Sequence, residues 1–123
     1  MSITGAHVLL YSSEPDKVRA ILRDVFGWSN VDAGGGWLIF GLPPAEVAVH
    51  PAEGASFEAG HQHQFTLMCD NLEKTTGELA AKGVQVAGEP HTERWGVHVM
   101  LDFPGGLKVM LYQPFHPVAI SRQ

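Results

Sequence analysis

The sequence is poor in cysteine, in positive charge and in long apolar runs, and each shortage excludes a class of protein. Its one cysteine, Cys69, cannot form an intrachain disulfide, which argues against a disulfide-stapled secreted fold. Lys plus Arg number 8 against 13 Asp plus Glu, and the net charge of -5 argues against a nucleic-acid partner. The apolar runs VLLY and WLIFGL are far too short to span a membrane. The N-terminal residues show no basic start followed by a long apolar run, which is the pattern of a secretory signal. We therefore expect a cytoplasmic protein.

What the sequence does contain is typical of one globular domain. Hydrophobic residues make up 45% of the 123 positions and charged residues 17%, which is too apolar for a disordered chain. A chain of this length forms one domain, or two small modules that share a core.

The first half predicts a strand, a helix and three short strands. GAHVLLYSS has a strand-like apolar pattern, and EPDKVRAILRDVFG has an apolar stripe at helical spacing. Ser13 is the expected N-cap, and Gly27 the expected stop in a left-handed conformation. Three short strands are expected at about 29–31, 37–40 and 46–50, separated by glycine- and proline-rich turns.

The second half repeats this order. HQFTLMC predicts a strand, and DNLEKTTGELAAKG predicts a helix capped by Asp70 or Asn71 and stopped by Gly83. Strands follow at about 84–87, 97–103 and 107–112. The repeat predicts an α+β fold of two βαβββ modules, forming a curved mixed sheet with a cup-shaped cavity and the helices on the outer face. Module one covers about 4–51, a linker 52–61, module two 62–114 and a tail 115–123. A dimeric ferredoxin-like α+β barrel is a competing fold, which the duplicated offset disfavours.

Strand parity predicts which side chains face away from the helices. Alternate residues of a strand point to opposite faces, and the apolar set should pack on the helices. The other face then combines apolar walls with a few polar groups, as a small-molecule pocket requires. It collects His7, Tyr11, Glu46, Ala48, His50, Gln64, Thr66, Met110 and Tyr112.

The sequence resembles the vicinal oxygen chelate superfamily, the fold of glyoxalase I, bleomycin resistance proteins and extradiol dioxygenases. The resemblance covers about residues 4–114 and is carried by HVLLYSSEPDKVRAILRDVFGW, QFTLMCDNLEKT, ERWGVHVMLDFPGG and KVMLYQP. It implies paired βαβββ modules and a small-molecule site, often in a homodimer.

The resemblance also implies where a metal would bind. Members that hold a metal use one ligand from the first strand of each module, which matches His7 and Gln64. They use a carboxylate from the last strand of each, where this sequence has Ala48 and Met110. A thioether is a poor ligand for oxygen-preferring ions, and alanine is none. His50, on the same predicted face as Ala48, could substitute as a nitrogen ligand.

Several other residues are candidates for ligand contact, and each also has a simpler structural interpretation. Trp95 and Trp37 lie near glycines and could wall the pocket or pack in an interface. His98 shares a strand face with Met100 and Asp102 and could touch a ligand. His91 is expected in a polar loop and His116 in a solvated tail. Parity places His63 with Phe65, Leu67 and Cys69 on the helix side, and His61 in or near the linker, so this conspicuous pair is not the expected site.

Three functions follow. The first is a non-enzymatic or weakly catalytic protein that binds a small organic molecule in the cup, as bleomycin-sequestering relatives do without metal. Its expected ligand-binding residues are His7, Tyr11, Gln64, Thr66, Met110, Tyr112 and Trp95. The alternative is a glyoxalase-like lyase or extradiol dioxygenase whose divalent metal (Fe, Mn, Ni or Zn) is held by His7, His50 and Gln64. The third is a protein whose open sheet face is an interface with another protein.

Overall fold

The second half of the chain forms the sheet on which the rest of the molecule is built. A computed structural model describes residues 7–46, 48, 49, 51–61 and 63–120. Strands β3 (Thr66–Met68), β4 (Gln85–Thr92), β5 (Gly96–Phe103) and β6 (Leu107–Pro114) form one sheet in the order β3-β6-β5-β4. β3 runs parallel to β6, and the other pairs are antiparallel. With helix α3 (Leu72–Ala81) between β3 and β4, the second module is a complete βαβββ unit.

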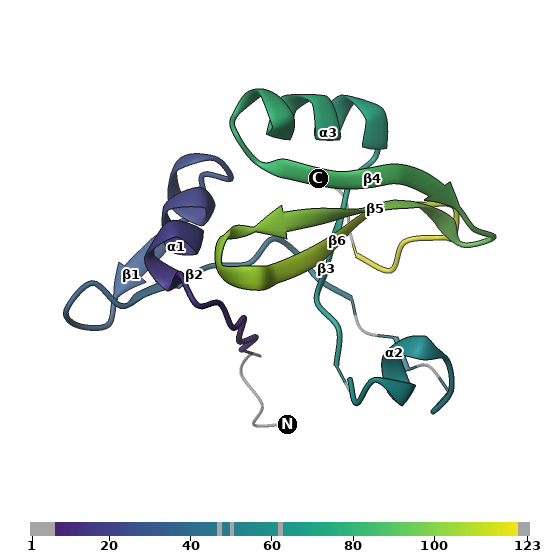
Figure 1. The fold of residues 1–123 in the computed structure, drawn as a ribbon, viewed down its shortest axis with the longest axis horizontal. Coiled ribbons are helices and arrows are strands. Elements are labelled where there is room, and N and C mark those ends of the chain that lie inside the picture. Colours follow the sequence, from purple (N-terminus) through teal and green to yellow (C-terminus); the bar gives the residue numbers. More distant parts are fainter. Residues whose placement is uncertain (1–6, 47, 50, 62, 121–123) are drawn as a thin grey trace.

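The first half contributes a helix and a hairpin. Helix α1 (Pro15–Asp24) is followed by the antiparallel pair β1 (Asn30–Asp32) and β2 (Leu38–Phe40). The fold is therefore α+β, as predicted. In Figure 1, α3 lies along one side of the sheet, α1 and the β1–β2 hairpin lie beyond the β5–β6 turn, and α2 (Ala55–Glu58) stands apart. None of the described helices is long and apolar enough to cross a membrane.

One face of the sheet carries the core. Val99, Leu101 and Phe103 of β5 alternate with half-exposed neighbours, and Leu101 is completely buried. They pack with Val109 and Leu111 of β6, with Leu72 of α3 and with Val18 and Leu22 of α1. Helices α1 and α3 thus cover the same face of the sheet, as parity predicted, and the described residues place no helix against the other face.

The helix caps correct one expectation and confirm another. Glu14, not Ser13, is the N-cap residue of α1 and makes no side-chain cap bond. Helix α1 starts at Pro15, so the hydroxyl that binds a backbone N–H at this end is that of Ser12, one position before the predicted Ser13. Ser12 Oγ accepts a hydrogen bond from the Glu14 N–H at 3.0 Å. In α3, Asn71 accepts from the Lys74 N–H at 3.0 Å, as a capping side chain should.

Gly83 has the expected left-handed backbone, with φ of 89°, just after α3 ends. Helix α1 ends at Asp24, before Gly27, whose φ is also positive at 71°.

Two strands predicted for the first module are not formed by its described residues. Residues 7–12 form no strand, and neither do the described residues of the segment expected at 46–50, Glu46, Ala48 and Val49; residues 47 and 50 lie outside the described part. A strand exists only where its backbone N–H and C=O groups meet a neighbouring strand, and the described residues supply no such neighbour for these segments. The linker expected at 52–61 also contains the short helix α2.

Candidate functional site

The helix-free face of the sheet, called the open face below, is organised in rows across the strands. Residues that are opposite in register share a face. Thr66 of β3, Met110 of β6, Met100 of β5 and Ala87 of β4 form one row. The next row toward the β4–β5 turn is Met68, Tyr112, His98 and His91. These two rows are mostly half-buried, unlike the closed core on the other face.

A third row closes the opposite end of the open face with charge. Asp102 of β5 lies opposite Lys108 of β6 and accepts a 2.6 Å hydrogen bond from its ammonium group. The open face therefore passes from an ion pair through methionines to an aromatic end. Such a surface can contact an apolar molecule while offering a few polar groups at its borders.

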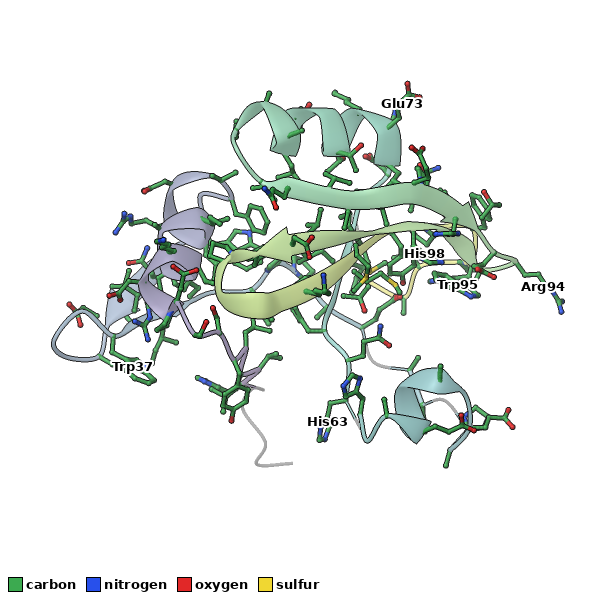
Figure 2. All side chains as sticks on the ribbon, in the orientation of Figure 1. Trp37, His63, Glu73, Arg94, Trp95 and His98 are labelled. Carbon is green, nitrogen blue, oxygen red and sulfur yellow. The ribbon has the colours of Figure 1, made fainter. Side chains whose placement is uncertain are left out.

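The aromatic end is a set of stacked rings. Trp95, in the turn between β4 and β5, stacks on His98 with 5.1 Å between ring centroids and 14° between planes. The same indole meets Tyr112 edge to face at 5.5 Å. His91 stacks on His98 at 5.7 Å, and Glu93 lies 3.5 Å from His98 Nε2. Figure 2 shows Trp95 and His98 side by side at this end of the sheet, with Arg94 pointing away.

His91 lies in β4, not in the loop expected for it. β4 is the edge strand, which tolerates the glycine and proline of its sequence GEPH because its outer side has no partner. The pairing with β5 shifts register between Ala87 and His91, and Gly88 there has a φ of 74°. This bulge brings His91 opposite His98.

His116, expected to be solvated, is instead bound to the sheet. Its Nε2 lies 3.1 Å from the Tyr112 hydroxyl, and its Nδ1 lies 2.7 Å from the Pro117 carbonyl oxygen. The signal in the sequence was the four-residue spacing in YQPFH, where two prolines flank a turn. Burial raises the pKa of Tyr112, and the nearby carboxylate of Glu46 raises it further.

Three of the predicted site residues, His7, Tyr11 and Gln64, lie outside the strands of this face, whereas Glu46 of module one lies near Tyr112. His7 and Tyr11 are exposed, Tyr11 at 80%, and they make no hydrogen bond to the described residues of the sheet. Gln64 is exposed two residues before β3, and His50 lies outside the described residues. Thr66, Met110, Tyr112 and Trp95 are brought together, on β3, β6 and the β4–β5 turn.

Trp37 and His63 lie elsewhere. The guanidinium of Arg19 sits 4.8 Å from the Trp37 ring centroid, so this indole serves the α1–hairpin contact. In Figure 2, Trp37 lies near β1 and β2, and His63 on the segment beside α2, both away from Trp95. A shallow, open depression lies on the outside of α3 and is lined in part by Glu73, which Figure 2 shows far from Trp95.

The described residues of the open face offer few ligands for a divalent metal. No three His, Cys, Asp or Glu side chains converge in the described part of the chain. One carboxylate of the open face, Asp102, is paired with Lys108. Met110 and Met100 offer only thioether sulfur, which oxygen-preferring ions bind poorly.

Comparison with known proteins agrees with this geometry at the level of the fold. The family model described as Glyoxalase/Bleomycin resistance protein/Dioxygenase superfamily matches residues 5–111. No curated protein matches the sequence significantly.

Solved structures with the same fold include TnmS3, an antibiotic binding protein from Streptomyces sp. CB03234, at a TM-score of 0.62 and 22% identity, covering 93% of this chain and 98% of that one. A lactoylglutathione lyase from Agrobacterium tumefaciens is similar at a TM-score of 0.61 and 20% identity, covering 89% and 92%. A superfamily member from Sphaerobacter thermophilus DSM 20745 matches at 0.61 and 16% identity, covering 92% and 99%.

Proposed function

Because the chain belongs to the Glyoxalase/Bleomycin resistance protein/Dioxygenase superfamily, we propose that it binds a small organic molecule on its open face without a metal. The observation that carries the proposal is Met110, which lies between Thr66 and Met100 at the position where metal-binding relatives are expected to have a carboxylate. With a thioether there, the centre of the face favours apolar contact over ion coordination.

The chemistry of the face indicates the kind of ligand. Methionine side chains are flexible and polarizable, so Met68, Met100 and Met110 can adapt to molecules of different shape. Trp95 and His98 add flat rings at one end, and Tyr112 adds a hydroxyl. A planar, mainly apolar molecule with one or two polar groups matches this arrangement. The fold likeness to an antibiotic binding protein supports the proposal.

The metal-dependent alternative has weaker support. It rests on the fold likeness to a lactoylglutathione lyase and on His7, His50 and Gln64 as ligands. His7 and Gln64 are both exposed and lie outside the strands. Elemental analysis of the purified protein, before any chelator, tests it. A stoichiometric Fe, Mn, Ni or Zn ion that is lost in His7→Ala would replace the metal-free proposal.

We further propose that a second copy of the chain completes the open face, so that the working form is a homodimer. The chain exposes 9147 Å², whereas a compact monomer of 13.3 kDa would expose about 6,500 Å². The excess includes apolar residues in the unpaired segments of module one, Leu9 at 61% and Val49 at 95% exposure. Segments with unpaired backbone and exposed apolar side chains are suited to add to another sheet.

Light scattering on a sizing column tests the homodimer. The wild type should have twice the mass of the chain, and Leu9→Lys should shift it toward the monomer. Glu73→Lys, an exposed change on α3, is the control and should stay dimeric. A monomeric wild type at a concentration of about 0.1 mM, well above typical dissociation constants of stable dimers, would contradict the homodimer.

Calorimetric titration with 2-naphthol, a planar probe with one hydroxyl, tests the binding. The wild type should bind it saturably. Met110→Glu should weaken binding about tenfold or more, because a carboxylate on the apolar row must lose water when the ligand covers it. Met110→Leu keeps the volume and should change affinity less than about tenfold, as volume-conserving swaps do. Equal affinities of the wild type and Met110→Glu for 2-naphthol would mean that the probe binds away from Met110.

A further inference from the structure

Two hydrogen bonds fix the proton arrangement of the His116 ring. The carbonyl oxygen of Pro117 can only accept, so the Nδ1 atom 2.7 Å away must carry a proton. In the neutral ring, Nε2 then has none and is an acceptor. The hydroxyl of Tyr112, 3.1 Å from Nε2, therefore donates its proton to His116.

This arrangement decides what Tyr112 can offer to a ligand. A phenol has one proton to donate and lone pairs that accept. Because the proton is used by His116, the oxygen is left as an acceptor. Tyr112 lies in the row of His98 and Met68 on the open face, with Trp95 against its edge. A ligand on that face therefore meets an acceptor at this point.

The surroundings keep the pair in place. The Phe115 N–H donates to the Trp95 carbonyl at 2.8 Å, which ties the start of the tail to the β4–β5 turn. The Ala119 N–H donates to Glu46 Oε2 at 2.9 Å, which ties the tail to module one. Both Tyr112 and His116 are half-buried. Burial also raises the pKa of Tyr112, so the phenol keeps the proton that it donates.

We propose that the Tyr112–His116 pair sets the hydrogen-bonding polarity of the open face. While His116 is neutral, Tyr112 accepts and the face selects ligands that carry an O–H or N–H donor at this point. When His116 gains a proton, Nε2–H donates to the Tyr112 oxygen, and the hydroxyl proton turns to the ligand. The face then selects an acceptor. This inference rests on the proposed function, because it concerns a ligand on the same face.

Other titratable groups face the same place, so a pH effect alone does not identify His116. The carboxylate of Glu46 faces Tyr112 and the tail, and His98, with its partner Glu93, lies opposite Tyr112 in register and stacks on Trp95. The test therefore compares variants at one pH before it changes the pH.

The proton arrangement is measured first, without ligand. In a ¹⁵N spectrum of the imidazole rings at about pH 8, where histidine is neutral, His116 should show a protonated Nδ1 and a bare Nε2. Tyr112→Phe should shift the Nε2 signal, because it removes the donor, and leave Nδ1 protonated. A His116 ring protonated at Nε2 and bare at Nδ1 would overturn the inference.

The selection is measured with a matched pair of probes, 2-naphthol as donor and 2-methoxynaphthalene as its methyl ether. At about pH 8 the wild type should prefer the naphthol about fivefold, the value of one net hydrogen bond. Tyr112→Phe should remove the preference, and this variant also reports any effect of the added methyl group. His116→Phe frees the hydroxyl to donate or accept, so the preference should fall below about twofold.

At an acidic pH at which the ¹⁵N spectrum shows both nitrogens of the His116 ring protonated, the wild type should lose or reverse the preference, while His116→Phe should not change with pH. A pH effect of equal size in His116→Phe would assign it to Glu46 or His98 and overturn the inference. If the wild type binds both probes equally at about pH 8, the inference is overturned and the proposed function is not. No binding of either probe overturns the proposed function for planar aromatics and the inference with it.

Discussion

The hydroxyl of Ser12 donates a 2.6 Å hydrogen bond to the carbonyl oxygen of Pro104, 92 residues away in sequence. The Ser13 N–H adds a 3.1 Å bond to the Gly105 carbonyl. These two bonds tie the start of α1 to the turn between β5 and β6, and so connect the two halves of the chain.

We predict that Ser12→Ala lowers the free energy of unfolding by about 1–3 kcal/mol, because it removes two intramolecular hydrogen bonds with a usual net value of about 0.5–1.5 kcal/mol each. The loss includes the cap that Ser12 Oγ provides to the Glu14 N–H. Ser13→Ala is the matched control, because its exposed side chain makes no described hydrogen bond, and it should be neutral. Urea denaturation measures both. A larger loss of unfolding free energy in Ser13→Ala than in Ser12→Ala would mean that the Ser13 side chain caps α1 after all.

Gly96 is predicted to be intolerant of any side chain. A Cβ there would lie 2.5 Å from the backbone oxygen of Gln113 on the neighbouring β6, and backbone cannot move aside cheaply. Gly96→Ala should destabilise the fold by about 1–3 kcal/mol, as overpacking does. Gly77→Ala is the contrast, because a Cβ there meets nothing within 4 Å. It should stabilise α3 by about 0.5–1 kcal/mol. If the denaturation midpoints of Gly96→Ala and Gly77→Ala moved in the same direction, these two predictions would be contradicted.

The phenol of Tyr112 should ionise later than usual. In Tyr11→Phe it is the remaining tyrosine, so absorbance near 295 nm reports it alone, as about one phenol. Burial, with Glu46 second, raises its pKa, and the midpoint should lie above the ordinary value of 10.0. A folded-state pKa above the unfolded one means that Tyr112 contributes stability below about pH 10, which is lost as the pH rises through its folded pKa. A midpoint below the ordinary value would contradict the burial.

Cys69 should react slowly in the folded protein. Its thiol is half-buried, lies 3.6 Å from the Tyr112 carbonyl oxygen and has a pKa raised chiefly by burial. Because the thiolate is the nucleophile, fewer reactive molecules are present than for a free cysteine. Reaction with a coloured disulfide reagent at about pH 8 should be about tenfold slower than in urea-unfolded protein. Equal rates in the two conditions would show that Cys69 is accessible.

The open face could be predicted from the sequence because strand parity needs only local information. Thr66, Met110 and Tyr112 lie on the same face as expected, and the α+β order of the second module is as predicted. The alternation of side chains between two faces is a property of the strand itself, so it does not depend on which strand is the neighbour.

The rest depended on contacts that alternation does not record. The apolar pattern around Leu9 predicted a strand, but a strand also needs a neighbouring strand, and the part of the chain that the structure describes supplies none there. Pro90 and Gly88 suggested a loop, because the sequence does not tell an edge strand with a bulge from a turn. The contacts of His116 were missed because they require the chain to turn after β6, which brings the ring back to Tyr112.

The central claim, that the open face binds a planar organic molecule, is tested most directly by labelling the methionine methyl groups with ¹³C and titrating with 2-naphthol. The account predicts saturable shifts of the Met68, Met100 and Met110 methyl signals, with the same dissociation constant as in calorimetry. It also predicts that the indole N–H signal of Trp95 moves with them, while that of Trp37 stays in place. Saturable binding in the calorimeter with these three methyl signals unmoved would contradict the account.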